Sequence, residues 1–130
     1  MKIYILIPIF NDWDSVSELL KNIDIEIKNL NHEVSVIIIN DASTEIKEIN
    51  TLTLKNINSA EIVNMTKNQG HSRCIASGLK YIFKEKDFDY VIPMDGDGED
   101  RPEEIIDFIQ LADHSENKTI IGERIKRSEG

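Results

Sequence analysis

Two patterns of hydrophobic and polar positions alternate along the chain. Short runs of apolar residues, many of them β-branched, predict buried strands at 2–8, 34–39, 60–65, 90–94 and 119–122. Between these runs the apolar residues recur at helical spacing, which predicts helices at 14–30, 43–54, 72–84 and 102–112. Strands that alternate with helices indicate an α/β fold, with a mostly parallel sheet covered by helices on both faces.

Single residues refine the expected helices. Asp12 or Asp14 is a candidate N-cap for the first helix, because its carboxylate can accept hydrogen bonds from the free amides of the first turn. Pro102 suits the first turn of the last helix, where its missing amide costs nothing. Gly78 lies inside a predicted helix at a cost of about 1 kcal/mol relative to Ala, so we expect it to allow close contact between helix and sheet. Cys74, on the first turn of the same helix, is expected to pack in the core.

Mostly polar segments follow the predicted strands. The carboxyl ends of parallel strands meet at one edge of a sheet, and ligands of such folds bind at that edge. Most of the residues with candidate chemistry therefore lie at a single edge. The segments that follow the five strands are 10–12, 40–43, 68–71, 95–100 and 123–124.

The sharpest chemical signal is the sequence MDGDGED at 94–100. Asp95 and Asp97 are two residues apart and flanked by glycines, so both carboxylates can reach one cation from the same side. Their hard oxygen atoms suit Mg²⁺ or Mn²⁺, which would in turn bind the phosphates of a substrate. A solvated acidic turn is the alternative, because Asp-Gly pairs form turns readily. An EF-hand fits less well, since Asp100 stands where that loop needs Gly and Ile106 where it needs Glu.

Three further segments at this edge have a functional and a structural interpretation. Asp41 directly follows a buried strand, as a carboxylate that recognises a base or ribose would, but it also suits the cap of a helix starting near residue 43. Gly70, His71 and Arg73 lie at a helix start, where free amides favour an anion, and the same side chains are common on ordinary surfaces. Arg124 belongs to a small basic cluster that either meets phosphate or forms a charged tail.

Composition narrows the class of protein. The chain has 130 residues, enough for one domain, and 40% of them are hydrophobic, enough for a core. Its 15 Lys and Arg against 24 Asp and Glu give a net charge of −9, which argues against nucleic-acid binding and against electrostatic docking on anionic lipid. A single cysteine excludes an internal disulfide framework and favours a reducing, cytoplasmic compartment. No apolar run approaches the roughly 20 residues of a transmembrane segment, and Pro8 interrupts the first one.

Five motifs together resemble family 2 glycosyltransferases, in particular those of the dolichyl-phosphate mannosyltransferase and polyprenyl-phosphate glycosyltransferase type. The resemblance covers the whole chain in order, and the combination is specific although each motif alone is weak. The motifs are IPIFND at 7–12, INDAS at 39–43, NQGHSRCIASGLKYI at 68–82, IPMDGDGEDRPEEI at 92–105 and GERIKRSEG at 122–130.

The resemblance implies a fold and an activity. The family has a GT-A fold, whose nucleotide-binding half is a Rossmann-like, mostly parallel sheet flanked by helices. Its members transfer a sugar from a nucleotide-diphosphate donor, usually with inversion and with a divalent metal. For this chain it implies a UDP- or GDP-linked sugar as donor, Mg²⁺ or Mn²⁺ as cofactor, and a lipid-linked acceptor such as a polyprenyl phosphate. It also implies a role in cell-envelope glycan synthesis, with the full-length parent associated with the cytoplasmic face of a membrane.

The family's donor-site residues carry over to specific positions. Pro8 and Asp12 would line the nucleotide pocket after the first strand, and Asp41 would contact the base or ribose. The turn from Gly70 to Arg73, with His71, would border the nucleotide. Arg124 matches an arginine that lies close to the diphosphate.

Asp95 and Asp97 match the DXD signature of the family, in which the second acid typically holds the metal and the first lies nearer the ribose. Other positions depart from the family pattern. Asp12 stands where Glu is common, Asn40 replaces the first carboxylate of a frequent Asp-Asp-Gly-Ser motif, and Ala42 replaces its glycine. These departures bear on which base is recognised more than on the fold.

Length bears on what the chain can do alone. A complete GT-A enzyme needs roughly another hundred residues, so we expect residues 1–130 to be the donor-binding portion of a longer chain. We expect the acceptor-binding half to lie outside these residues, and the catalytic base with it. The chain does not fit a response-regulator receiver, because Asn68 and Gln69 follow the third strand and Arg124 follows the fifth, in place of the residues that such a domain needs there. It does not fit a dinucleotide-dependent oxidoreductase either, because no GxGxxG motif follows the first strand. A non-catalytic nucleotide-binding or interaction domain with the same fold remains the alternative.

Overall fold

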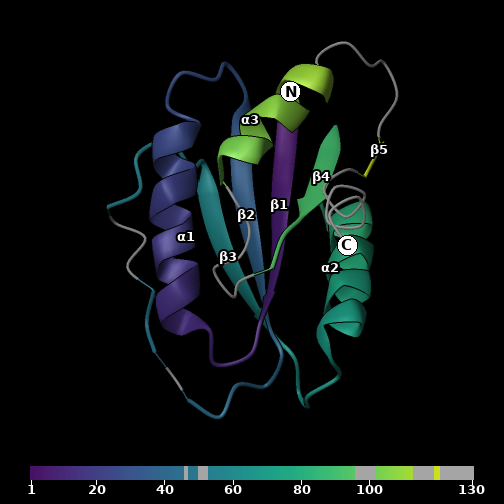
Figure 1. Ribbon diagram of the computed structural model, residues 1–130. Coiled ribbons are helices and arrows are strands. Elements are labelled where there is room, and N and C mark those ends of the chain that lie inside the picture. Colours follow the sequence, from purple (N-terminus) through teal and green to yellow (C-terminus); the bar gives the residue numbers. More distant parts are fainter. Residues whose placement is uncertain (46, 50–52, 96–101, 113–118, 121–130) are drawn as a thin grey trace.

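The computed structural model describes residues 1–45, 47–49, 53–95, 102–112 and 119–120. Within this part of the chain, five parallel strands form one sheet in the order β3-β2-β1-β4-β5 (Figure 1). The strands are β1 (Lys2–Ile9), β2 (Glu33–Asn40), β3 (Ser59–Asn64), β4 (Tyr90–Pro93) and β5 (Thr119–Ile120). The helices are α1 (Trp13–Glu26), α2 (His71–Glu85) and α3 (Pro102–Ala112). The predicted parallel α/β sheet is confirmed.

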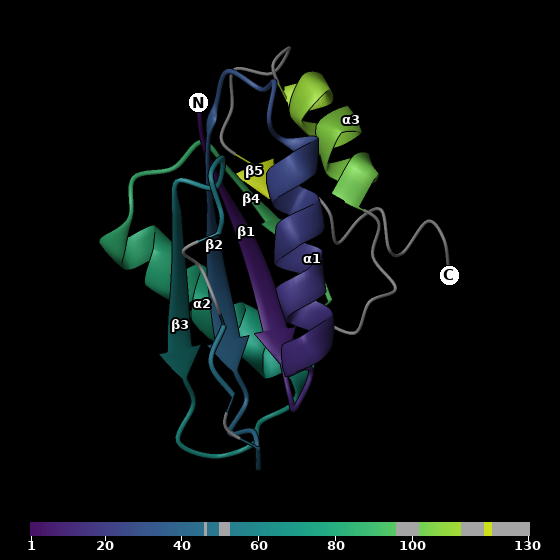
Figure 2. The same ribbon diagram turned by 90° about the vertical axis from the view of Figure 1, so that its left-hand side faces the viewer.

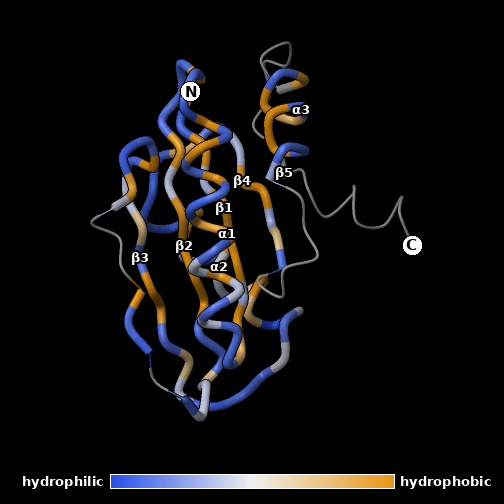
Figure 3. The backbone as a smooth tube through the Cα atoms, turned by 60° about the vertical axis from the view of Figure 1, so that its left-hand side comes forward, coloured by the Kyte–Doolittle hydropathy of each residue, from blue (hydrophilic) through white to orange (hydrophobic). Residues whose placement is uncertain are grey.

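The helices cover the sheet on both faces. Helices α1 and α3 lie on one face, and α2 lies on the other (Figure 2). The strands in the middle of the sheet are apolar along most of their length, while the helices alternate between apolar and polar positions (Figure 3). A strand covered on both faces needs apolar side chains in both directions, which is why these strands read as continuous hydrophobic runs.

Close packing of α2 depends on one glycine. A methyl group at Gly78 would meet the side chain of Leu6, with Cδ2 only 2.9 Å away, and would lie 3.2 Å from Cγ1 of Ile39. Neither neighbour can withdraw easily, because both are buried in the core beneath α2. The expectation that Gly78 allows close contact between helix and sheet is confirmed. Cys74, one turn earlier, is fully buried as expected.

Helix α1 is shorter than the predicted 14–30 and begins without the expected side-chain cap. Asp12 occupies the N-cap position, but its carboxylate accepts a hydrogen bond from the backbone amide of Phe10 at 3.0 Å. Asp14 lies in the first turn and forms an exposed ion pair with Lys47 at 3.3 Å. The prediction that a carboxylate caps the first turn is therefore wrong, because both side chains find partners outside the helix.

The predicted helix at 43–54 is also wrong, since none of its described residues is helical. Tertiary hydrogen bonds take the backbone groups that a helix would use. The amide of Glu45 donates to Oδ1 of Asn11 at 2.9 Å, and its carbonyl accepts from Nε1 of Trp13 at 2.9 Å. Ala42, just before the segment, has a φ of 56°, which a right-handed helix cannot accommodate.

Candidate functional site

The strand order reverses between β1 and β4, at the centre of the sheet. The chain leaves β1 toward β2 on one side and leaves β4 toward β5 on the other, so the loops diverge at the carboxyl ends of β1 and β4. Ligands of such sheets bind in the crevice at this point. Asp12 follows β1 and Asp95 follows β4, while Pro8 is buried near the end of β1. The amide of Met94 donates to the carbonyl of Leu6 at 2.9 Å and so keeps the start of the acidic loop beside β1.

Asn11 joins the loop after β1 to the loop after β2. Its backbone amide donates to Oγ of Ser43 at 2.9 Å, and its side-chain amide donates to Oγ1 of Thr44 at 2.8 Å. Its Oδ1 accepts from the amide of Glu45. Asn11 has a φ of 60°, a left-handed conformation that Asn tolerates better than most residues. No role was expected for Asn11 from the sequence, although its place in the polar segment after a strand was the available signal.

Asn40 closes the turn that follows β2. Its Nδ2 donates to Oδ1 of Asn64 on β3 at 2.9 Å, and its Oδ1 accepts from the amide of Ser43 at 3.1 Å and from Oγ of the same residue. Ala42 lies inside this turn with positive φ. An amide can both donate and accept, whereas a carboxylate can only accept. Asn40 therefore has a structural role, which the sequence did not indicate because Asn stands where the family motif has a charged Asp.

Asp41 is buried, with 1% of its surface exposed, and its carboxylate is fully engaged. Oδ1 accepts from the backbone amide of Gln69 at 2.7 Å and Oδ2 from that of Gly70 at 2.9 Å, and the thiol of Cys74 is a third donor. Burial alone would raise the pKa of Asp41, but these donors outweigh it and hold the pKa below its usual value. The alternative in which Asp41 caps a helix near residue 43 is wrong, because the described residues there form no helix.

The turn before α2 brings Gly70, His71 and Arg73 to the same edge. Gly70 precedes the helix with a φ of 91°, a conformation that other residues rarely adopt. His71 and Arg73 are exposed on the first turn, and Nη1 of Arg73 lies 3.4 Å from Oε1 of Gln69. No side chain caps this helix start. Its first-turn amides are therefore open to a ligand or to water.

The predicted metal ligands are only partly within the described chain. Asp95 is half-buried at the end of β4, while Asp97 and Arg124 lie outside the described residues. Among the residues that the structure describes, no three His, Cys, Asp or Glu side chains gather as a metal site requires. A carboxylate at the switch point has the oxygen chemistry that Mg²⁺ and Mn²⁺ prefer, so Asp95 offers donor atoms of the kind that such a metal would need.

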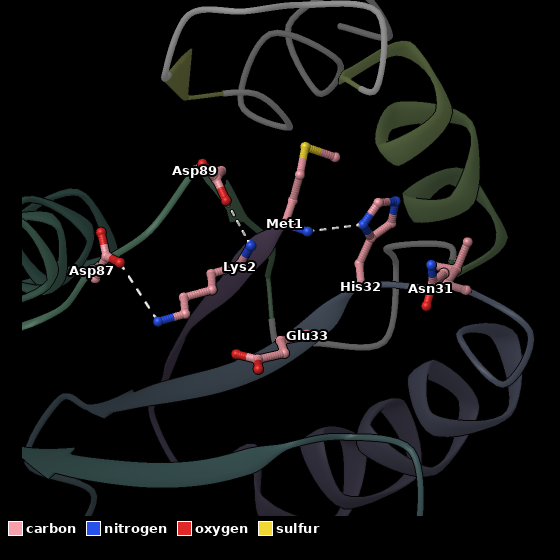
Figure 4. A pocket seen from close by; sticks show the side chains of 8 residues that line it. Met1, Lys2, Asn31, His32, Glu33, Asp87 and Asp89 are labelled. Carbon is pink, nitrogen blue, oxygen red and sulfur yellow. Dashed lines mark hydrogen bonds and ion pairs between the residues drawn. The ribbon is translucent and has the colours of Figure 1, made fainter.

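A hollow of about 520 Å³ lies at the opposite, amino edge of the sheet (Figure 4). The polar groups of this hollow largely pair with one another. The backbone amide of Lys2 donates to Oδ2 of Asp89 at 2.7 Å, and Nζ of Lys2 lies 3.5 Å from Oδ2 of Asp87. The amino group of Met1 lies 3.2 Å from Nδ1 of His32. None of the residues predicted for the site lines this hollow. The strand topology, and not the size of a cavity, identifies the candidate site.

The helices in the described part of the chain are all too short or too polar to cross a membrane.

The fold and the strand-end residues can be compared with known proteins. Residues 4–130 match the family model described as "Glycosyl transferase family 2". An undecaprenyl-phosphate 4-deoxy-4-formamido-L-arabinose transferase of Pseudomonas savastanoi pv. phaseolicola is 28% identical over 111 residues, which cover 84% of this chain and 32% of that protein. A dolichol-phosphate mannosyltransferase of Pyrococcus furiosus is 28% identical over 110 residues, which cover 85% and 30%. The chain thus spans about a third of the length of these curated relatives.

Solved structures agree on the fold. The crystal structure of S. aureus TarS 1–349 superimposes with a TM-score of 0.60 at 20% identity, covering 87% of this chain and 32% of that one. The same protein in complex with UDP-GlcNAc gives a TM-score of 0.55 at 21% identity, with coverage of 87% and 31%. At this level of identity the likeness establishes the fold alone.

Proposed function

The chain belongs to glycosyl transferase family 2, and we propose that it is the donor-binding portion of an enzyme that transfers a sugar from a nucleotide-diphosphate donor. The observation that carries this proposal is the convergence of Asp12, Asp41 and Asp95 on one edge, at and beside the switch point of a parallel sheet. Family membership over residues 4–130 supports the same conclusion independently of that geometry.

The proposed donor pocket is the carboxyl edge of β1, β2 and β4. Pro8, near the end of β1, and Asp12, after that strand, would form its floor, and Gly70, His71 and Arg73 would border it from the start of α2. The two exposed side chains of this turn offer hydrogen-bond donors toward an anionic ligand. A structure of TarS was solved in complex with UDP-GlcNAc, which supports a nucleotide sugar as the ligand of this edge.

Charge explains why an acidic edge would bind an anionic donor. A divalent cation held by Asp95 and Asp97 would supply positive charge to the donor's diphosphate. During transfer the acceptor oxygen attacks the anomeric carbon while the bond from that carbon to the diphosphate oxygen breaks. Negative charge develops on the leaving diphosphate, and Arg73, with Arg124 as the family resemblance implies, would stabilise it.

The names of the relatives support a polyprenyl phosphate as acceptor. Two of them are named for undecaprenyl phosphate and dolichol phosphate. A phosphate acceptor is already ionised at neutral pH, so it needs little help from a general base. We accordingly propose that residues outside this chain bind the acceptor, that the parent protein works at the cytoplasmic face of a membrane, and that its product serves cell-envelope glycan synthesis.

Calorimetric titration of the chain with UDP and with GDP, each with and without Mn²⁺, tests the proposal. We expect one nucleotide to bind only when metal is present. Asp97→Asn should abolish that binding, because the neutral amide is a far weaker metal ligand. Asp87→Asn, at the opposite edge of the sheet, is the matched control and should bind normally.

Two results would contradict the proposal. A folded sample that binds neither nucleotide with metal has no donor site of this kind. Binding that is independent of metal and unaffected by Asp97→Asn would favour a non-catalytic nucleotide-binding domain.

A further inference from the structure

A smaller cavity, of about 250 Å³, lies at the amino edge of the sheet beside the hollow of Figure 4, with which it shares Lys2, Glu33 and Asp87. Its lining comes from the starts of β1 and β2, from the end of α2 with the two residues after it, and from the residue before β3. No residue predicted for the donor site is part of this lining. The cavity is therefore separate from the carboxyl edge, where the donor is proposed to bind.

Ser35 on β2 places an unbonded hydroxyl in this cavity. The side chains of Ile37 and Ile39 pack beneath α2, and the two-residue period of a strand directs Ser35 to the same face. Only 4% of Ser35 is exposed, and no group among the described residues bonds to its hydroxyl. No described side chain has a fully buried polar atom without a partner, so the hydroxyl must open into the cavity that Ser35 lines. A buried hydroxyl in this situation needs a hydrogen-bonding ligand.

Neutral donors and acceptors lie beside Ser35. Tyr4 is its register partner on β1, and Asn58 directly precedes Ser59, its register partner on β3. Tyr4 and Asn58 line the same cavity. Hydroxyl and amide side chains can each donate and accept hydrogen bonds. This combination matches the hydroxyl groups of a ligand, which also donate and accept.

The charged residues around the cavity are paired and do not favour an ion. Nζ of Lys2 lies 3.5 Å from Oδ2 of Asp87, and Nζ of Lys86 lies 3.3 Å from Oε2 of Glu61. Two glutamates add negative charge to the lining, which disfavours an anion. The two ammonium groups disfavour a cation, and within the described ranges no three His, Cys, Asp or Glu side chains gather to bind a metal. The lining therefore suits a neutral ligand.

We propose that this cavity binds a small neutral polyhydroxylated molecule, the class to which monosaccharides and glycerol belong, and that the Ser35 hydroxyl bonds to it directly. The volume lies below the roughly 300–1,000 Å³ of sites for drug-sized ligands, which limits the ligand to about a dozen non-hydrogen atoms. The site is at the opposite edge of the sheet from the donor pocket and does not depend on the proposed function.

Titration of the whole ¹⁵N-labelled chain with D-glucose, D-mannose and glycerol, followed by amide NMR, tests the proposal. We expect the amide signals of Ser35, Asn58 and Lys86 to move along one saturable curve. The dissociation constant should be about 1 to 10 mM, the affinity that about a dozen non-hydrogen atoms provide in a polar pocket. The tightest of the three probes distinguishes a monosaccharide from a shorter polyol. Inorganic phosphate and Mg²⁺ are the ionic probes, and saturable binding of either at these amides in preference to the polyols would overturn the ligand class.

Two substitutions of Ser35 separate binding from stability. Ser35→Ala removes one hydrogen bond to the ligand and should weaken binding about fivefold. Ser35→Val also fills part of the cavity and should abolish binding. Both variants should fold as stably as the wild type, because the hydroxyl has no partner among the described residues to lose. Ser77→Ala, at an exposed position on α2, is the matched control and should bind normally.

Three results would contradict the proposal. The first is a wild-type chain that shows no saturable shift with any of the three polyols. The second is a folded Ser35→Ala variant that binds as tightly as the wild type. The third is displacement of the polyol by saturating UDP or GDP with Mg²⁺, which would place it in the donor pocket. A chain that binds a polyol but neither nucleotide would overturn the proposed function alone.

Discussion

Asp24 and Asp41 are both buried carboxylates that accept backbone amides, but they lie at opposite edges of the sheet. Asp24, near the end of α1, accepts from the amides of Lys55, Asn56 and Ile57 at 2.7 to 3.1 Å, where the chain enters β3. Asp41 accepts from the connection that leaves β3 for α2.

The difference lies in what each bonded segment leads to. The segment held by Asp24 continues into the amino end of β3, where no predicted site residue lies. The segment held by Asp41 leads to His71 and Arg73 at the proposed donor pocket. One chemical arrangement can thus lie away from the proposed site at one edge and within it at the other.

Substitution of Asp24 is expected to have the largest effect on the stability of the protein. Asp24→Ala leaves three backbone amides without their acceptor inside the protein, so we expect the free energy of unfolding to fall by about 3 kcal/mol. Urea denaturation measures this loss, with the neighbouring exposed Glu26→Ala as the control. Nucleotide affinity of the folded fraction should not change. A matching fall in affinity would remove the contrast between the two aspartates.

Gly78→Ala tests whether Asp41 controls only the first turn of α2. The added methyl group would press on Leu6 and Ile39, and we expect a loss of about 2 kcal/mol in the free energy of unfolding. In amide NMR spectra, bonds to a carboxylate shift the Gln69 and Gly70 protons downfield. These shifts should remain, because the body of the helix moves while its start stays bonded to Asp41. Loss of those shifts in the NMR spectrum would mean that packing along the helix places the turn.

Ala42→Gly removes strain beside Asp41 and should stabilise the protein. Ala42 has a φ of 56°, a conformation that costs L-residues other than glycine about 1 kcal/mol. We expect the free energy of unfolding, measured by thermal denaturation, to rise by about 1 kcal/mol. Ala76→Gly on the exposed side of α2 is the matched control and should lose about 1 kcal/mol, since glycine is unfavourable inside a helix. A loss at both positions would contradict the assignment of strain to Ala42.

The smallest effect concerns acid stability. The pKa values of Asp24 and Asp41 are lowered in the folded protein, because backbone amides outweigh the effect of burial that would raise them. Both groups therefore stabilise the fold above their unfolded pKa of about 3.9, and that stabilisation is lost as the pH falls through the lower folded values. Urea denaturation from pH 6 downward should show little change above about pH 5 and a decline below about pH 4. Asp24→Asn should make that decline shallower; an unchanged slope would contradict the lowered pKa of Asp24.

Local patterns were sufficient for most elements of the fold. The predicted helix at 102–112 has the bounds of α3, and each predicted strand is present, although residues 121–122 of the last one lie outside the described chain. Strands buried on both faces and helices with one apolar face carry their signal in neighbouring residues. The family was also recognisable from motif order, and the match over residues 4–130 confirms it.

Local patterns failed where distant residues competed for the backbone. The apolar spacing at 43–54 favoured a helix, but Asn11 and Trp13, about 30 positions earlier, take the polar groups of Glu45. Asp12 had the right position for a cap and turned to Phe10 instead. Helical propensity is worth tenths of a kcal/mol per residue, so a few tertiary hydrogen bonds can override it.

The sequence by itself determined the alternation of strands and helices, the edge at which the polar residues gather, and the family. Only the tertiary structure decided what those polar residues bond to. Asp41 could be a ligand contact, a helix cap or an internal acceptor on the sequence alone, because its partners Gln69, Gly70 and Cys74 lie about 30 positions away. A carboxylate takes the donors that folding brings within reach, and that geometry is a property of the whole sheet and not of the residues next to it.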